Sequence, residues 1–330
     1  MNRPFFEIRM PTYNRPDLLR RAIESLLRQT YPHWKAVVFD DSTCDEAREI
    51  VQSTGDDRIT YRKNQVRMGA AGNIDQCFSP RSMFSGHYGC LLEDDNYWLP
   101  DFLAQVSRSL LGRDSQIILA NQRVCDERSG LQGPEVTTRG DWFFGGIVSP
   151  LYLRATLLLM EGISNGGLVW RLEHEVDLRV GPTVKEAGIQ EACRSLLVTA
   201  PFLFISQALA VWTSLPQSKS ARARETYRSF GRGMQSIRSF ILCSHGRTVV
   251  EAARPIARKQ GLDSRLVETL SYSGYPHLAG DLARGRTSAA CRAVAKGLAI
   301  RLVQENPCEE FIRLLARQSN DNSRRFGSSR

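Results

Sequence analysis

Three acidic residues in a row follow an apolar segment of the sequence. Glu93, Asp94 and Asp95, with Asn96 after them, come directly after the run 88–92, which reads Tyr-Gly-Cys-Leu-Leu. Because that run is too apolar for a strand with one wet face, it predicts a buried central strand. Unpaired buried carboxylates are very costly, and ligands bind at the carboxyl ends of strands in open α/β sheets. Carboxylates at such a place typically hold a hard cation that holds a diphosphate, so the segment predicts metal-assisted chemistry on a nucleotide-activated substrate.

Polar residues also follow two other predicted strands. The segment 5–10 alternates like a strand and leads into a loop over 11–16, and the predicted strand 34–39 ends at Asp40 and Asp41. The segments between these strands have helical patterns, and this β-α-β-α order predicts a mostly parallel sheet. The polar residues after the three strands are therefore expected together at the carboxyl edge of one sheet.

The helix after the first loop has a clear one-sided apolar pattern. Asn14 is expected to cap it, and Pro16 suits its first turn. The residues on its apolar face are Leu18, Leu19, Ala22, Ile23, Leu26 and Leu27. Other predicted helices run to about residue 53, around 73–77 and over 100–111, predicted strands cover 58–62 and 116–120, and 202–212 reads as a strand or a buried helix.

The length and composition are those of an ordinary soluble protein. At 330 residues the chain exceeds one typical domain, which predicts one large α/β domain with an addition. Hydrophobic residues make up 42% of the sequence, and no run reaches the roughly 18 apolar residues that span a bilayer. The chain starts with Met-Asn-Arg-Pro and a strand-like segment, so we expect no signal peptide.

Cysteines and charge indicate the surroundings of the chain. The eight cysteines form no Cys-x-x-Cys pair, so neither a zinc site nor a disulfide framework is predicted and a reducing cytoplasm is expected. Of the net charge of +9, residues 219–330 carry +12, from 21 Lys/Arg and 9 Asp/Glu. The remainder is close to neutral at −3. This asymmetry predicts two modules, of which the basic one either contacts an anionic partner or has a solvated basic surface.

Several motifs follow one another in the first half of the chain. Pro-Thr-Tyr-Asn stands at 11–14, Leu-Arg-Gln-Thr-Tyr-Pro at 27–32, Val-Val-Phe-Asp-Asp-Ser-Thr at 37–43, and Glu-Asp-Asp-Asn at 93–96 with Leu-Pro-Asp at 99–101. In this order they resemble the motifs of the inverting GT-A glycosyltransferases of family 2, over residues 8–178. The resemblance implies an α/β fold of the GT-A (Rossmann-like) type, with a mostly parallel sheet flanked by helices. We expect a helical C-terminal region in addition, with an unstructured end from about Ser319.

The resemblance implies roles for the residues of the first two loops. Tyr13, in the motif that starts at Pro11, offers a flat face on which uracil or another base can stack. Asp40 or Asp41 would accept a hydrogen bond from the N–H of the base, while the other would help to close the strand-to-helix turn. The simpler alternatives are packing for Tyr13 and helix capping for both acids.

The resemblance also implies how the diphosphate is held. Arg67 and Asn73, together with Gly69, resemble the family's Asn-x-Gly…Arg-Asn loop in a degraded form, and Arg67 could neutralise a phosphate or contact the base. Asp94 would contact the ribose or a metal-bound water. Asp95 would ligate Mn²⁺ or Mg²⁺ bridging the diphosphate, and the cation would stabilise charge on the departing nucleoside diphosphate. Without the other motifs, an acidic triplet at the end of a strand is as often a solvated loop or a helix cap as a metal site.

A second acidic segment, 173–178, reads Glu-His-Glu-Val-Asp-Leu. Family members often carry Glu-Asp-x-Asp-Leu near here, on a helix beneath the acceptor. The best alignment places Glu175 as the catalytic base that deprotonates the attacking acceptor, with His174 in place of the usual acid and Asp177 as the runner-up base. The alternative is a charged helix face with pairing four residues apart to Arg171 or Arg179.

The chain departs from the family pattern after the last predicted core strand. Family members often have a basic or histidine-containing segment there, but residues 211–216 read Val-Trp-Thr-Ser-Leu-Pro. Ser218-Lys219-Ser220 is the expected substitute. This departure leaves open whether the shell of the metal is complete.

We therefore predict a metal-dependent, inverting glycosyltransferase of the hexosyltransferase type, with a UDP-sugar favoured as donor. The predicted parts are a nucleotide-sugar-binding half over 1–125, an acceptor-binding half with the base over 126–217, and a basic helical region over 218–330. The acceptor is a hydroxyl or amine of a glycan, a lipid-linked glycan or a natural product. The predicted location is cytoplasmic, with peripheral contact to the inner membrane surface through the basic region.

Two alternatives come from other classes of protein. A sugar nucleotidyltransferase would need a Gly-rich, basic loop after the first strand, and 11–14 is not such a loop. A catalytically idle nucleotide-binding module would act through its basic helices at a membrane or a partner. Nucleic acid is not an expected partner, because the basic residues are spread over helices without a recognition motif.

Overall fold

The computed structural model describes residues 3–126, 130–131, 133, 136–160, 162–174, 177–214 and 221–327, the side chains of 131, 221–227 and 319–327 excepted. The chain divides into two compact units. The first consists of Met1–Pro150, Ile163–Arg179 and Leu197–Ser218, and the second of Leu151–Gly162, Val180–Leu196 and Lys219–Arg330.

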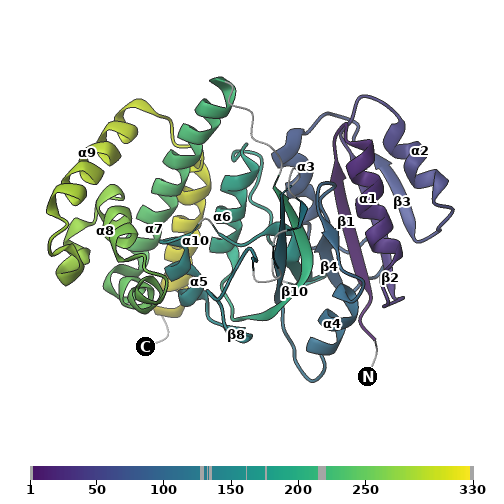
Figure 1. Ribbon diagram of the computed structural model, residues 1–330, viewed down its shortest axis with the longest axis horizontal. Coiled ribbons are helices and arrows are strands. Elements are labelled where there is room, and N and C mark those ends of the chain that lie inside the picture. The colour runs from purple at the N-terminus through teal and green to yellow at the C-terminus, as the bar shows by residue number, and fades with distance from the viewer. Residues whose placement is uncertain are drawn as a thin grey trace. The chain divides into compact units, whose positions relative to one another are not determined.

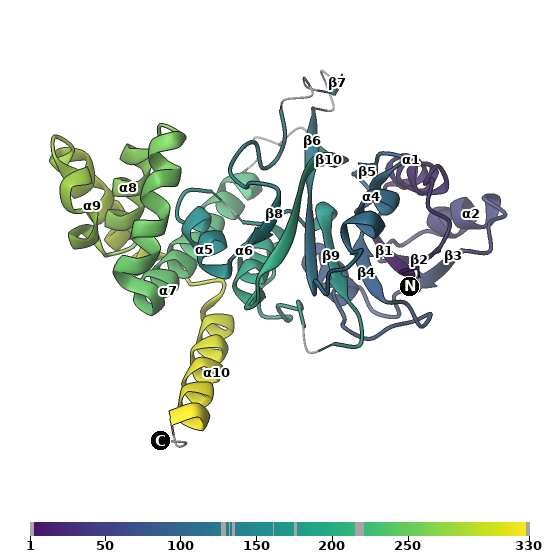
Figure 2. The same cartoon turned by 90° about the horizontal axis from the view of Figure 1, so that it is seen from below.

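The first unit is built on one mixed sheet (Figure 1), with the strand order β3-β2-β1-β4-β9-β6-β10-β5. The strands are β1 Phe6–Thr12, β2 Trp34–Asp40, β3 Ile59–Lys63, β4 Tyr88–Leu91, β5 Tyr97–Trp98, β6 Ile117–Asp126, β7 Gly130–Leu131, β8 Gly146–Val148, β9 Leu168–Arg171 and β10 Phe202–Ser214. Pairing is parallel from β3 through β4 and between β6 and β10, which Figure 2 shows side by side. β9 is antiparallel to both of its neighbours, β5 and β8 are antiparallel to β10, and β7 is antiparallel to β6.

Alternate residues of the central strands face a core that three helices cover. The helices are α1 Pro16–Leu27, α2 Glu46–Ser53 and α4 Phe102–Ser109. Phe6, Ile8 and Met10 of β1 lie in this core with the predicted apolar face of α1, including Leu19 and Leu26. The apolar face of the strand, which has a period of two, thus packs against the apolar face of the helix, as the sequence patterns predict.

The opposite face of β1 buries a charged pair. Glu7 and Arg9 are both 1% exposed and lie 3.4 Å apart, between Oε2 and Nη2. Arg9 donates to the carbonyls of Cys77, Ser79 and Arg81, just after α3 Gly69–Cys77. The Glu7 carboxylate accepts the backbone N–H groups of Met83, Phe84 and Gly86. A buried charge needs such partners, so this pair fixes the loop between α3 and β4.

Two local predictions were wrong. Asn14 does not cap α1: its φ is +50°, and no side chain caps the helix, whose N-cap is Arg15. The Asn14 amide oxygen instead accepts the N–H of Thr43 across the loops. The first strand also runs further than expected, because parallel pairing with β2 continues to Thr12 opposite Asp40.

The second unit is helical, as predicted for the C-terminal region. Its elements include α5 Pro150–Leu157, α6 Ala187–Leu197, α7 Ala221–Lys259, α8 Asp263–Tyr272, the 3₁₀ segment η2 Pro276–Ala283, α9 Thr287–Val303 and α10 Glu309–Gly327. α7 is broken at Gly246, whose φ is +50°. The backbone of α10 continues past Ser319, where an unstructured end was expected. Within the described residues, no helix has the length and apolar character needed to cross a bilayer.

The backbone around Gly167 packs closely against strand β6, and a substitution at Gly167 can test this packing. This glycine ends the 3₁₀ turn η1 Asn165–Gly167 before β9, and an added Cβ would lie 2.2 Å from the carbonyl oxygen of Ala120 in β6. Gly167→Ala should lower the free energy of unfolding by about 1–3 kcal/mol, since the strands must move apart. The measurement is a urea titration followed by fluorescence.

The control is Gly231→Ala in α7, where the nearest atom to a Cβ is 3.9 Å away and alanine is the better helix former. It should be neutral or slightly stabilising. Equal stability of Gly167→Ala and wild type would contradict the close packing of β6 on this turn.

Candidate active site

The carboxyl ends of β1, β2 and β4 bring acidic residues from separate loops together. Parallel registers place Thr12 beside Asp40, and β4 on the other side of β1. The Thr12 hydroxyl then donates to Asp94 Oδ2 at 2.9 Å, and the N–H of Tyr13 lies 3.4 Å from the same oxygen. The first loop and the acidic segment therefore lie in contact at the edge of the sheet, as the sequence predicts.

Asp94 is nearly buried, with 5% of its surface exposed. Burial raises the pKa of its carboxyl group to about 6, the nearby Arg15 opposes that shift, and the charge of Asp95 adds to it. Desolvation disfavours the charged form of a carboxyl group, so a cation close by stabilises this site. The environment of Asp94 thus favours a bound positive charge.

Arg15 supplies one such charge. Its Nη1 atom lies 3.2 Å from Asp94 Oδ1 and 2.9 Å from Asp95 Oδ2, so one guanidinium bridges both carboxylates. The side chains of Arg15 and Asp95 remain 43% and 22% exposed, and both reach solvent. Sequence reasoning missed Arg15, although its position directly after Tyr13-Asn14 could have drawn attention to it.

The two carboxylates fit a divalent cation that is shared with a substrate. Within the described residues, no group of three or more His, Cys, Asp and Glu could enclose a metal ion. Mg²⁺ is usually held by one or two carboxylates together with substrate phosphates, so a fuller protein shell is not required. Asp94 and Asp95 offer hard oxygen ligands, and Arg15 marks the place where positive charge is stabilised.

Arg21 and Asn96 complete the acidic loop on the side of β10. Arg21 Nη2 donates to the carbonyl of Asp95 at 2.6 Å and lies 3.3 Å from the hydroxyl of Thr213. Asn96 accepts the N–H of Thr213 and donates to Glu93 at 2.9 Å. Thr213 thus contributes from the stretch where the family pattern predicted Arg or His, whereas 215–220, including the expected substitute Ser218-Lys219-Ser220, lies outside the described residues.

Asp40 is fully engaged inside the protein. Oδ1 accepts the N–H of Ser42 at 2.8 Å, and Oδ2 accepts the Tyr61 hydroxyl at 2.7 Å and Lys63 Nζ at 3.1 Å. Burial alone would raise the pKa of Asp40, but these hydrogen bonds hold it below 3.8. The bond to Ser42 closes the turn after β2, which is one of the two roles expected for this acidic pair.

Asp41 and Asn73 hold the neighbouring loop. Asp41 accepts the backbone N–H groups of Met68 and Gly69, both at 2.8 Å, at the start of α3. The Asn73 amide donates to the carbonyls of Thr12 and Phe39, and so ties the ends of β1 and β2 together. A donor-binding role for Asp40, Asp41 and Asn73 stays a prediction, and their contacts show that they also build the edge.

Tyr13 and Arg67 lie against each other at the surface of this edge. The guanidinium carbon of Arg67 is 4.7 Å from the centre of the Tyr13 ring, which is a cation–π contact. Pro11, by contrast, is buried in β1 opposite Phe39. A base that stacks on Tyr13 would therefore share the ring with Arg67 or displace it.

The second acidic segment has no helix in its described part. Glu173 has a φ of +54°, and its carboxylate accepts the N–H of Ser82. The expected helix is absent at 172–174 and 177–180, and Glu175 lies outside the described residues. Among the described residues Arg171 pairs with Asp114 and Arg179 with Asp177, and the alternative pairing of either arginine with Glu175 lies outside the described residues.

Comparison with known proteins shows which family the first part of the chain resembles. Residues 7–151 match the model described as "Glycosyl transferase family 2". This segment of the chain, a little under half of its 330 residues, is similar to glycosyl transferase family 2. The match includes the three loops that carry Tyr13, Asp41 and Asp95, so the resemblance stated from the sequence is confirmed.

Curated proteins that are named glycosyltransferases resemble part of the chain. Over 105 residues it is 35% identical to the Escherichia coli K12 protein "Putative colanic acid biosynthesis glycosyl transferase WcaA", which covers 31% of this chain and 37% of that protein. Over 120 residues it is 29% identical to the Escherichia coli "UDP-Glc:alpha-D-GlcNAc-diphosphoundecaprenol beta-1,3-glucosyltransferase WfgD", covering 36% and 46%. The matches thus span less than half the length of these relatives.

Solved structures show the fold over most of the chain. S. aureus TarS 1–349 superposes with a TM-score of 0.56 at 14% identity, over 91% of this chain and 92% of that one. At this identity the likeness shows the fold alone. It confirms the predicted GT-A class, a mostly parallel sheet flanked by helices with a helical C-terminal region.

The pKa of Asp40 predicts how the stability of this edge depends on pH. Asp40→Asn should lower the free energy of unfolding at pH 7 by roughly 2 kcal/mol, since hydrogen bonds to a charged group are worth about that much. The folded pKa lies below the ordinary 3.8, so the stabilisation is present above about pH 4 and is lost as the pH falls through the folded pKa. Urea titrations from pH 7 to 3 should show the gap to wild type closing below about pH 4. Asp57→Asn, at an exposed position, is the control, and a gap that widens on acidification would contradict the assignment.

Proposed function

We propose that the chain transfers a sugar from a nucleotide-sugar donor, with a UDP-sugar favoured, to an acceptor hydroxyl or amine with inversion. The observation that carries this proposal is the pair Asp94 and Asp95 at the carboxyl edge of a family 2 domain, beside Tyr13. Support for the donor comes from the relative WfgD, whose name gives UDP-Glc as its donor. We place donor binding in 1–125, the acceptor side in 126–217 and the basic region in 218–330.

Tyr13 and Arg67 are proposed to bind the nucleotide. The ring provides a stacking face, and the arginine, exposed and without an ion pair among the described residues, has its charge available for the diphosphate or the base. Asp40 or Asp41 would accept a hydrogen bond from the base, with Pro11 and Asn73 setting the position of these loops.

Asp95, with Asp94 beside it, is proposed to hold Mn²⁺ or Mg²⁺ together with the diphosphate of the donor. When bound, the cation would stabilise negative charge on the leaving nucleoside diphosphate. Arg15 now pairs with Oδ1 of Asp94 and Oδ2 of Asp95, so the cation would compete with Arg15 for the negative charge of these carboxylates.

Glu175 is proposed as the base that takes the proton from the acceptor. Asp177 is the weaker candidate, because the hydrogen bonds from Arg179 outweigh burial and hold the pKa of Asp177 below 3.8. A carboxylate with a lowered pKa and a bound cation is a poor proton acceptor.

The acceptor is proposed to be a lipid-linked glycan at the cytoplasmic surface of a membrane. The support is the printed name of WfgD, which includes a diphosphoundecaprenol acceptor, together with the basic helical region of this chain. Other glycans and natural products are the remaining acceptor classes.

The ion pair of Arg15 with Asp94 and Asp95 favours a second candidate. If Arg15 keeps both carboxylates neutralised, the domain binds nucleotides without a cation and without turnover. Such a module would act through its basic helices. The two candidates differ in the metal dependence of nucleotide binding.

Calorimetry with UDP, GDP, dTDP and CMP, with and without Mn²⁺, tests the donor site. We expect UDP to bind in the presence of Mn²⁺, and Asp95→Asn to weaken that binding at least tenfold, because it removes one negative charge facing the cation. Asp57→Asn, at an exposed position away from the three loops, should bind UDP as wild type does. UDP binding that is independent of Mn²⁺ and of Asp95 would favour the idle module, and failure of every nucleotide to bind would refute both candidates.

Turnover distinguishes the two proposed bases. With UDP-glucose and a GlcNAc-diphospho-prenol acceptor, Glu175→Gln should lower kcat by about 10²–10⁴ while leaving UDP affinity unchanged. Asp177→Asn, the matched change two residues away, should lower kcat less than about tenfold. The reverse order would assign the base to Asp177.

A further inference from the structure

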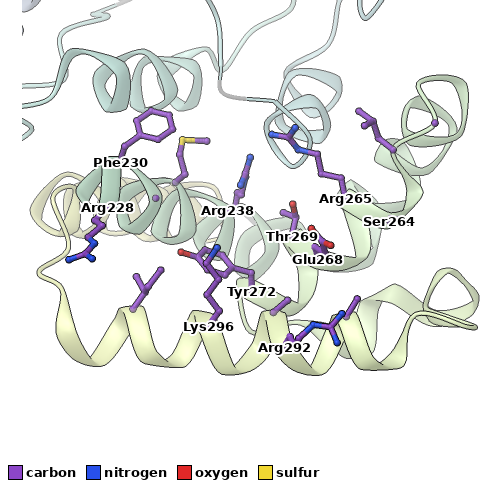
Figure 3. Close-up of a pocket in the computed structure, with 17 residues that line it drawn as sticks. Arg228, Phe230, Arg238, Ser264, Arg265, Glu268, Thr269, Tyr272, Arg292 and Lys296 are labelled. Carbon is purple, nitrogen blue, oxygen red and sulfur yellow. The ribbon is translucent and has the colours of Figure 1, made fainter. Parts of the chain in front are cut away.

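The second unit contains a large groove between α7, α8 and α9. Its volume is about 880 Å³. Figure 3 shows the side chains that line it, with Arg228 and Arg238 on α7, Arg265 on α8, and Arg292 and Lys296 on α9. This groove takes no part in the proposed transfer.

The charge of the groove is strongly positive. Five of its side chains are Arg or Lys, and Glu268 is the acidic one. Within the part of the chain that the structure describes, Arg228, Arg265, Arg292 and Lys296 make no ion pair, while Arg238 donates to the carbonyl of Leu157 at 2.9 Å. Cations gathered without counter-charges repel one another, so they favour an anionic ligand.

The remaining lining of the groove is largely apolar. Phe230 and Met234 of α7, Leu262 before α8, and Ile300 of α9 line it, with the ring of Tyr272 among them. A small hydrated anion would leave this surface unused. A ligand with a charged head and an apolar body matches both parts.

The outer side of α9 adds further apolar surface. Leu298, Leu302 and Val303 are 54%, 86% and 81% exposed. At 100° per residue, Leu298 and Leu302 lie on the side of α9 opposite Ala293 and Ile300, which line the groove. These two leucines are therefore not part of the groove, whose own apolar side chains are those named above.

We propose that the groove binds the phosphate headgroup and the upper acyl chains of an anionic phospholipid of a membrane surface. The phosphate would pair with Arg265, Arg292 and Lys296, and the upper acyl chains would contact Phe230 and Ile300. The proposal deepens the proposed function, since a lipid-linked acceptor would lie in the same membrane, but the site consists of residues of the second unit alone.

Co-sedimentation of the full chain with vesicles tests the site. Vesicles of phosphatidylcholine alone are compared with vesicles that contain phosphatidylglycerol in addition, at two salt concentrations. We expect at least tenfold stronger partitioning onto the anionic vesicles, weakened by salt. Equal binding to both kinds of vesicle, or none to either, would overturn the proposal.

Charge reversal on α9 locates the binding. Arg292→Glu with Lys296→Glu should reduce binding to anionic vesicles at least tenfold. Lys185→Glu with Arg317→Glu makes the same change of net charge at two exposed positions of the second unit outside the groove, and should change binding less than about twofold. Equal losses in the two double variants would reduce the effect to net charge and overturn the assigned site.

The apolar contribution has its own pair of variants. Ile300→Ser, in the groove, should weaken vesicle binding severalfold at constant charge, whereas Leu111→Ser, at a 61% exposed position of the first unit, should not. Melting curves for each variant must match wild type. Stronger binding to RNA than to vesicles, lost in the α9 double variant, would replace the lipid with a nucleic acid.

The outcome for the membrane site is separable from that for the donor site. Calorimetry with UDP and Mn²⁺ on the α9 double variant should give wild-type affinity, because the substituted residues belong to the other unit. Loss of vesicle binding with intact UDP binding supports the membrane site. UDP binding without vesicle binding by wild type would refute the membrane site and leave the donor site standing.

Discussion

Compensation of negative charge at one edge of the sheet is the constraint on which the rest of this site depends. Four carboxylates, those of Asp40, Asp41, Asp94 and Asp95, meet where three parallel strands end. Near-buried like charges repel strongly, so each needs a compensating group close by. The groups are Lys63 and Tyr61 for Asp40, backbone N–H groups of Met68 and Gly69 for Asp41, and Arg15 for Asp94 and Asp95. The same contacts also hold the loops in place, so a change that removes a compensating group is expected to alter the loop geometry as well.

The four carboxylates differ in how completely their negative charge is compensated, and this difference separates structural acids from those open to a ligand. Asp40 accepts hydrogen bonds from three donors and closes the turn after β2. Asp95 remains accessible to solvent, and its partner is the long, half-exposed side chain of Arg15. The contact between Arg15 and Asp95 is partly exposed, and an ion pair of that kind is worth less than about 1 kcal/mol. Asp95 is therefore the carboxylate most able to exchange its partner.

Much of the first unit could be predicted from local patterns. α1, β2 and β4 follow from one-sided helical spacing and apolar runs, and the parallel order follows from their alternation. The contacts of Arg15 with Asp94 and of Arg9 with the loop after α3 could not, because they join residues far apart in sequence and depend on register. Asn14 shows the limit of a local rule: its type suits an N-cap, but the loop holds it at positive φ, where it meets Thr43 instead.

The separation of contacts along the chain has a consequence for synthesis on the ribosome. Asn96 receives its hydrogen bond from Thr213, which is made 117 residues later. At a synthesis rate of roughly 5–20 residues per second, Thr213 is added on the order of ten seconds after Asn96. Arg15, by contrast, precedes Asp95 by 80 residues and is already present when the acidic loop emerges. The arginine is thus the earliest counter-ion available to these carboxylates, and it is placed to protect the nascent chain before the second half of the sheet exists.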